Sequence, residues 1–108
     1  MTRDQRRERW LEEAFVEHLE FERNLSPSTL KAYRREIERF VDHATRTRDE
    51  PGDVRTSDIR DFVAHLWQQR LSPRSLERAL SSLRTYYAFL VAEGAVDANP
   101  ATTIGAVA

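Results

Sequence analysis

The sequence predicts an all-α domain, a compact four-helix bundle with short loops. Apolar residues recur at intervals of three and four in four separate stretches, which is the spacing of one face of a helix. No stretch alternates convincingly between apolar and polar residues as a half-buried strand would, and glycine occurs only at positions 52, 94 and 105. A chain of 108 residues has room for one hydrophobic core. The four apolar faces are therefore expected to meet in a single orthogonal or up-down bundle.

The first helix is expected over residues 5–23, where Leu11, Phe15 and Leu19 share one face. The remaining surface of this helix is rich in glutamate, and carboxylates can serve acid–base or metal chemistry. No cleft-forming or metal-binding partner accompanies them in the sequence, so a solvent-exposed acidic face is the favoured interpretation. These glutamates are Glu12, Glu13, Glu17 and Glu20.

Two further helices begin with the same tripeptide, Leu-Ser-Pro, which starts at position 25 and again 46 residues later at position 71. In each copy the serine can cap the helix by accepting hydrogen bonds from backbone N–H groups that have no helical partner. The proline then takes the first helical position, where its missing N–H costs nothing. The repeat predicts helices over residues 27–46 and 73–93, and Gly94 is placed to end the second of them.

The remaining helix is expected to begin at Thr56 or Ser57, with Asp58 at the positive end of its dipole, and to end near residues 69–70. Phe89 falls outside the apolar stripe of its helix, which a contact with another segment or domain would explain. The stripes themselves are Leu30, Tyr33, Ile37, Phe40, Val41 and Ala44; Ile59, Phe62, Val63, Leu66 and Trp67; and Leu76, Ala79, Leu80, Leu83, Tyr87, Leu90 and Val91.

The formal net charge of −1 argues by itself against a nucleic-acid binder. The charges are segregated, however. Residues 25–48 carry six Lys or Arg against three acidic residues, and residues 71–92 carry three against one, whereas the other three segments of the chain are each acidic. The two Leu-Ser-Pro helices are therefore the basic parts of an otherwise acidic chain.

The outer faces of these two helices combine cations with small hydroxyl residues. At about 100° per residue, these side chains fall opposite the apolar stripes. Small groups let a helix approach DNA closely while arginine reaches phosphates or guanine edges. The candidate DNA-binding residues are Ser28, Lys31, Arg35 and Arg39 on the first helix and Arg74, Arg78, Ser81, Ser82 and Thr85 on the second.

Several kinds of chemistry lack candidate residues. There is no cysteine, which excludes disulfides and thiolate zinc sites and leads us to expect a cytoplasmic protein. Neither a glycine-rich phosphate loop nor a metal-ligand motif occurs, and Tyr33, Tyr86 and Tyr87 lie on or beside apolar stripes, as packing residues do. The longest apolar run has 7 residues, far below the roughly 20 of a membrane helix. We expect no catalytic residue, cofactor, metal, membrane or small-molecule ligand.

The order and spacing of these elements resemble a known family. The pattern is Leu25-Ser26-x-x-Thr29-x-x-x-Tyr33, Thr56-Ser57-Asp58-Ile59, Leu71-Ser72-x-x-Ser75-x-x-Arg78-x-Leu80-Ser81-x-Leu83-Arg84-x-x-Tyr87 and Asn99-Pro100. It is similar to the N-terminal core-binding domain of tyrosine recombinases of the Xer type, in the phage-integrase superfamily. The resemblance covers about residues 11–101. It implies a SAM-like four-helix fold that clamps one side of a recombination site on double-stranded DNA.

The resemblance also implies that helices 27–46 and 73–93 face the major groove of the DNA. By phase, Arg84 lies nearer the apolar edge of its helix than the other cations. The residues that match family positions on or beside the two helices are Thr29, Lys31, Arg35, Arg74, Ser75, Arg78, Ser81 and Arg84.

The same resemblance divides the chain into a core-binding domain over residues 1–96 and the start of an interdomain linker over residues 97–108. In the family the catalytic residues lie in a following domain that these 108 residues do not include, so no enzymatic activity is expected of them alone. The full-length protein would break and rejoin DNA, with its protomers in a synaptic tetramer. The residues leave one alternative open, a helical protein-interaction domain whose basic faces bind an acidic protein partner.

Overall fold

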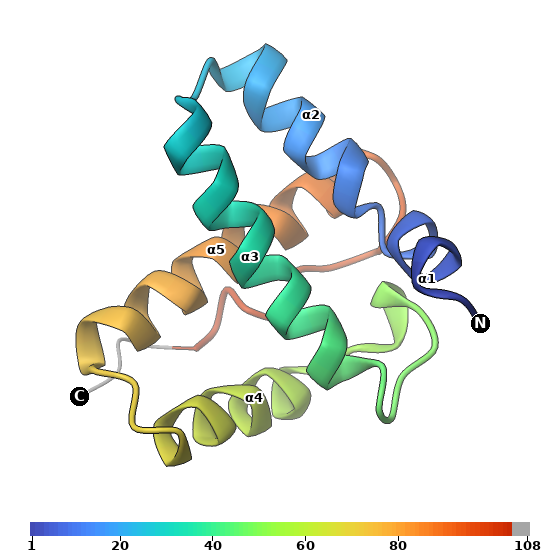
Figure 1. Cartoon of the computed structure of the whole chain (residues 1–108). Helices are drawn as coiled ribbons and strands as arrows, with labels where there is room; N and C mark the ends of the chain where they lie inside the picture. The colour runs from blue at the N-terminus through green and yellow to red at the C-terminus, as the bar shows by residue number, and fades with distance from the viewer. Residues whose placement is uncertain (105–108) are drawn as a thin grey trace.

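The computed structural model describes residues 1–104, and within that range the chain forms five α-helices, one 3₁₀ turn and no β-strand (Figure 1). The all-α prediction is confirmed. No helix in this part of the chain is long and apolar enough to cross a membrane. The elements are α1 (Arg3–Arg9), α2 (Glu12–Arg23), α3 (Pro27–Ala44), the 3₁₀ turn (Pro51–Asp53), α4 (Thr56–Gln68) and α5 (Pro73–Ala92).

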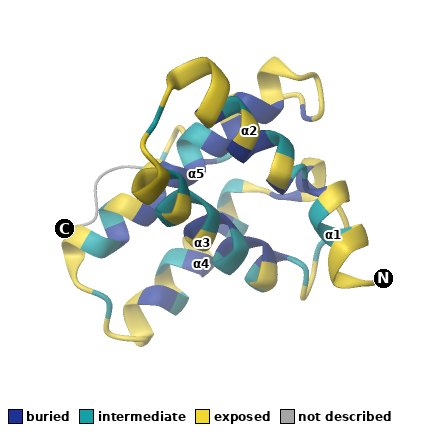
Figure 2. Ribbon diagram, turned by 45° about the horizontal axis from the view of Figure 1, so that its top comes forward, coloured by how far each residue is buried: buried dark blue, intermediate teal, exposed yellow. Residues whose placement is uncertain are grey.

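Helix α3 lies at the centre of the arrangement. It contacts α2, α4 and α5, while α1 contacts α2. Figure 1 shows α3 crossing α5, with α2 and α4 on opposite sides of the crossing, and Figure 2 shows that buried residues occur on the inward sides of these helices. Burying these apolar side chains is the main favourable term in folding. The largest of them are Trp10, Phe15, Leu19, Ile37, Phe40, Ile59, Phe62, Leu66, Leu76, Leu80, Tyr86 and Tyr87.

Both Leu-Ser-Pro helices begin as their sequence predicts. The Ser26 hydroxyl accepts a hydrogen bond from the Thr29 amide at 3.3 Å, and the Ser72 hydroxyl accepts one from the Ser75 amide at 3.2 Å. The following proline is the first residue of each helix. Gly94 adopts the left-handed conformation after α5, with φ of 74°. These local interactions set where α3 and α5 start and where α5 ends.

The predicted first helix is interrupted, and this prediction of one continuous helix is wrong. Leu11 adopts a left-handed conformation with φ of 55°, which separates α1 from α2. The interruption accompanies full burial of Trp10, whose ring lies edge-on to Phe40 at 6.2 Å between centroids. The Trp10 carbonyl accepts a hydrogen bond from the buried Tyr86 hydroxyl at 2.5 Å. Burial of a large aromatic ring outweighs the roughly 1–2 kcal/mol that a left-handed leucine costs.

Three apolar residues depart from their predicted environments. Trp67 is 57% exposed and Val91 is 38% exposed, although both were assigned to apolar stripes. Each lies at the edge of its stripe, where the packed helices leave α4 and α5 open to solvent. Phe89 lies outside the stripe of α5 yet is buried, because Phe15 and His18 of α2 pack on its ring with centroids 5.6 and 5.0 Å away. The predicted contact with another segment is therefore made by α2.

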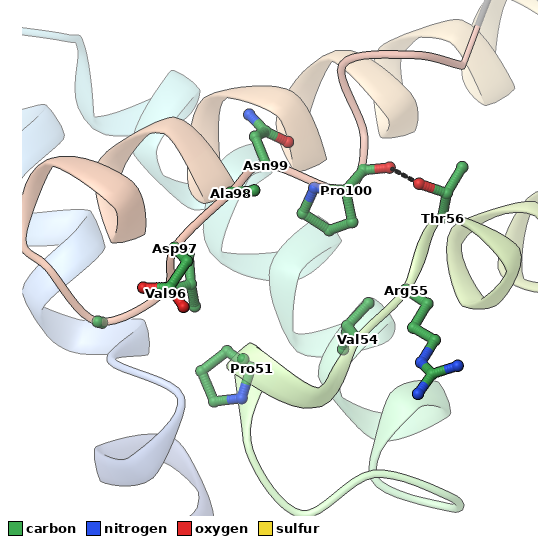
Figure 3. A pocket seen from close by; sticks show the side chains of 11 residues that line it. Pro51, Val54, Arg55, Thr56, Val96, Asp97, Ala98, Asn99 and Pro100 are labelled. Carbon is green, nitrogen blue, oxygen red and sulfur yellow. Dashed lines mark hydrogen bonds between the residues drawn. The ribbon is translucent and has the colours of Figure 1, made fainter.

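The segment after α5 folds back on the domain. The Asn99 side chain donates to the Arg84 carbonyl at 3.1 Å, and Ala101 is fully buried. The Thr56 hydroxyl donates to the Pro100 carbonyl at 3.1 Å (Figure 3). A linker that begins at residue 97 stays a prediction, and its last four residues, 105–108, lie outside the described range.

Candidate nucleic-acid interface

The two Leu-Ser-Pro helices meet in a groove of about 350 Å³. It combines residues from both predicted DNA-binding faces, which lie roughly 50 positions apart in the chain, with neighbours from the crossing of α3 and α5. Except for Tyr33, Glu36 and Arg78, the lining side chains are small, so the floor of the groove is accessible. The lining residues are Ser28, Thr29, Ala32, Tyr33 and Glu36 from α3 and Arg78, Ser81 and Ser82 from α5.

Four other predicted cations lie outside the groove lining. Lys31, Arg35 and Arg74 are exposed and Arg39 is half-buried. None of the four forms a hydrogen bond or an ion pair with another residue in the range 1–104. We call Arg35, Arg39 and Arg74 the free cations, since their charges remain available to a partner.

The half-buried hydroxyl residues of the predicted site serve their own helix. Ser75 accepts a hydrogen bond from the Ser72 hydroxyl at 3.1 Å within the helix cap. Thr85 donates to the Ser81 carbonyl at 3.1 Å, one turn earlier. Their measurable role in the structure is therefore local to α5.

Ser82 was predicted on the outer face of α5, and that placement is wrong. Its residue is only 5% exposed, because α3 covers this side of α5. The Ser82 hydroxyl donates to the carboxylate of Glu36, which is itself 8% exposed. Glu36 also accepts from the Arg78 Nε at 3.1 Å. Ser82 therefore supports the floor of the groove instead of lining an exposed face.

Glu36 is the residue of this site that sequence reasoning missed. It was read as a charged residue on the flank of its helix. A signal was available, because Glu36 lies three residues after Tyr33 and four before Phe40, which is the spacing of the apolar stripe. A carboxylate at such a position is buried and needs hydrogen-bond partners, which Arg78 and Ser82 supply.

The opposite flank of α3 has its charges paired inside the protein. Arg34 forms an ion pair with Glu13 of α2, and that hydrogen-bonded contact raises the pKa of Arg34. The other two pairs join α3 to α1. We call this set the paired flank, which consists of Arg34–Glu13, Arg7–Glu38 at 2.8 Å and Arg6–Asp42.

Arg84 also has partners within the domain. It is half-buried, donates to the Ala101 and Ile104 carbonyls and lies 3.6 Å from the Glu77 carboxylate. This placement agrees with its helical phase near the apolar edge. Arg84 holds the segment after α5 on the domain, so it is not among the free cations.

A second hollow, of about 490 Å³, lies between the 3₁₀ turn and the segment after α5 (Figure 3). Its lining contains one cation, Arg55, and one acidic residue, Asp97. It therefore lacks the concentration of cations found at the α3–α5 crossing. Within residues 1–104, no three His, Asp or Glu side chains are grouped so that they could hold a metal ion.

Residues 13–94 match the family model described as "Phage integrase, N-terminal SAM-like domain". The chain belongs to this family. The match covers α2 to α5, the helices that build the core and the groove. The resemblance stated from the sequence motifs is thereby confirmed.

Relatives of this SAM-like domain include three proteins named tyrosine recombinase XerC. The chain is 42% identical over 89 residues to the protein of Oceanobacillus iheyensis, covering 82% of this chain and 29% of the relative. It is 41% identical over 97 residues to that of Shewanella amazonensis (90% and 32%) and 37% identical over 93 residues to that of Roseiflexus sp. (85% and 30%). The chain thus spans about a third of the length of these relatives. No solved structure gave a significant match.

Proposed function

We propose that this domain binds double-stranded DNA as the core-binding domain of a tyrosine site-specific recombinase. The observation that carries the proposal is the set of free cations on the outer faces of α3 and α5, beside a groove lined mostly by small side chains. A cation that neutralises a phosphate releases condensed counterions, and a cation without an internal partner is available to do so. The family membership supports the same function.

In this proposal α3 and α5 approach the major groove of the duplex together. The major groove of B-DNA admits an α-helix, and small residues on the facing side allow close approach. Arg35, Arg39 and Arg74 contact phosphates and fix the position of the domain on the duplex. Ser28, Thr29 and Ser81 lie at the α3–α5 groove between these contacts. The domain then clamps one side of a recombination site.

The remaining steps belong to the whole protein. Relatives named tyrosine recombinase XerC are about three times as long as this chain, and it matches about 30% of each. We propose that the whole protein breaks and rejoins DNA through a further, catalytic domain, that residues 97–108 begin the linker to it, and that protomers meet in a synaptic tetramer.

Two adjacent arginines of α3 provide a matched test. Arg35 is a free cation, whereas Arg34 is paired with Glu13. Binding of the 108-residue chain to a pool of short random-sequence duplexes is measured between about 50 and 200 mM salt. Arg35→Ala is expected to reduce the slope of log affinity against log salt by about 0.9, the value for one phosphate contact, and Arg34→Ala to leave it unchanged.

Two outcomes would contradict the proposal. Equal effects of the two substitutions would show that the DNA-binding face is assigned to the wrong side of α3. Absence of binding at about 50 mM salt would remove the DNA-binding function and favour the alternative, in which the same cations bind an acidic protein.

A further inference from the structure

Arg78 differs from the other cations of the proposed interface because a buried carboxylate holds it. Its Nε donates to Glu36 Oε1 at 3.1 Å, and the second carboxylate oxygen of Glu36 accepts from the Ser82 hydroxyl. The two partners differ in exposure. Glu36 is 8% exposed, whereas the Arg78 side chain is 62% exposed at the rim of the α3–α5 groove. The pair therefore has a fixed, buried end and an open end.

The open end consists of the two terminal amino groups of Arg78. Neither of them donates a hydrogen bond to a residue in the described part of the chain. A buried carboxylate is unfavourable without its partners, so the contact with Arg78 forms on folding and holds the guanidinium before any ligand arrives. The ordering of a long side chain is then already complete when DNA binds.

A phosphate contact is a poor use of this arrangement. Counterion release depends on net positive charge, and the Glu36 carboxylate directly beneath Arg78 offsets that charge. The edge of a guanine instead presents two acceptors, O6 and N7, which match the two parallel donors at the end of a planar guanidinium. Ser28, Ala32 and Ser81 leave space in the groove beside that end.

We propose that Arg78 reads a guanine in the major groove and that Glu36 is the positioning residue that holds it for this contact. The inference rests on the proposed DNA-binding function. It divides the interface into two kinds of cation: the free cations contact phosphates and carry affinity, and Arg78 carries sequence preference. Glu36 and Ser82 do not touch the DNA.

The test is selection of bound duplexes from a random-sequence pool, followed by sequencing, for the unmodified chain and for Arg78→Lys, Arg78→Ala and Glu36→Gln. The unmodified chain is expected to enrich guanine at one position. The two Arg78 substitutions should reduce that preference by roughly 5- to 150-fold, the range for one bidentate contact. Arg78→Lys retains the charge and lies at an exposed position, so it reports on the fork without disturbing the fold.

Glu36→Gln gives the distinctive result. It should also lose the guanine preference, yet bind the unselected pool at least as tightly and with a salt slope up to about 0.9 steeper, because a negative charge is removed and Arg78 is released to phosphates. A purely structural role for Glu36 would instead weaken binding to all sequences and lower the unfolding midpoint.

The outcomes separate this inference from the function beneath it. Retention of the guanine preference in Arg78→Lys, or in a folded Glu36→Gln variant, overturns the inference while the DNA-binding function stands. Salt-dependent binding of the unmodified chain without any guanine selection does the same. Failure of the unmodified chain to bind any duplex at about 50 mM salt overturns the proposed function itself.

Discussion

The two flanks of α3 use the same kinds of residue for different purposes. On the paired flank, the charges of α3 are matched by residues of α1 and α2. On the outer side, Arg35 and Arg39 have no partner in the described part of the chain. Arg34 and Arg35 are neighbours in the sequence, yet only Arg35 has a charge that is free for a ligand. The lesson is that capacity to bind DNA depends on unpaired cations, which a net charge of −1 conceals.

Ion pairs are not what holds the paired flank together. The Arg6–Asp42 and Arg7–Glu38 side chains are all at least 26% exposed, and exposed pairs contribute about 0.2–1 kcal/mol each. Trp10, between α1 and α2, is fully buried against Phe40. The comparison therefore predicts that apolar anchoring dominates stability on this side, whereas charge dominates ligand binding on the other.

The largest expected effect is on that apolar anchor. Trp10→Ala should lower the free energy of unfolding by roughly 3–5 kcal/mol, because it removes a large buried ring and leaves a cavity. Urea denaturation measures it. Glu38→Gln, which breaks one ion pair of the same flank, is the control and should cost less than about 1 kcal/mol. A larger loss from Glu38→Gln than from Trp10→Ala would contradict the comparison.

A smaller effect is expected at Glu12, which is buried under the paired flank at 6% exposure and whose Oε2 has no hydrogen-bond partner. Burial, followed by the nearby Glu38 carboxylate, raises the pKa of Glu12 above its ordinary value of 4.5. The folded state thus holds the proton more tightly than the unfolded state does. As the pH rises above 4.5 through the folded-state pKa, Glu12 therefore lowers stability.

Removing this charge should stabilise the domain. Glu12→Gln is expected to raise the free energy of unfolding at pH 7 by roughly 1 kcal/mol, since it replaces a buried, incompletely bonded carboxylate. The gain should disappear below about pH 4.5, where Glu12 is protonated in both states. Urea titrations of both proteins across this pH range measure it, and a gain that is constant with pH would contradict the assignment.

The smallest expected effect concerns Arg70, which tests whether an exposed arginine contributes to folding. It ends α4 in a left-handed conformation with φ of 64°, the position that Gly94 occupies after α5. Arg70→Gly should raise the free energy of unfolding by about 0.5 kcal/mol, because relief of backbone strain exceeds the added flexibility of the unfolded chain. The matched control is Gly94→Ala.

That control isolates the backbone effect, because a Cβ at Gly94 would meet no atom within 4 Å. Gly94→Ala should therefore lower the thermal unfolding midpoint through its positive φ alone. A decrease in the midpoint for Arg70→Gly would instead show that the Arg70 side chain stabilises the fold.

The sequence by itself determined the all-α class and the limits of most helices. Residues 27–46 and 73–93 were predicted, and the structure has Pro27–Ala44 and Pro73–Ala92. These features were predictable because a cap, a helix-ending glycine and an apolar stripe act between residues a few positions apart. The free cations Arg35 and Arg74 were candidates on the same basis.

Only the tertiary structure decided which of the charged residues are available. Arg34 lies opposite Glu13, 21 residues away, and Glu36 lies opposite Arg78, 42 residues away. The interruption of the first helix likewise depends on the long-range contacts of Trp10 with Phe40 and Tyr86. Periodicity describes one helix in isolation, whereas α3 is covered by α2, α4 and α5. Pairing and burial follow from which distant residues the fold places opposite one another, and no local pattern contains that information.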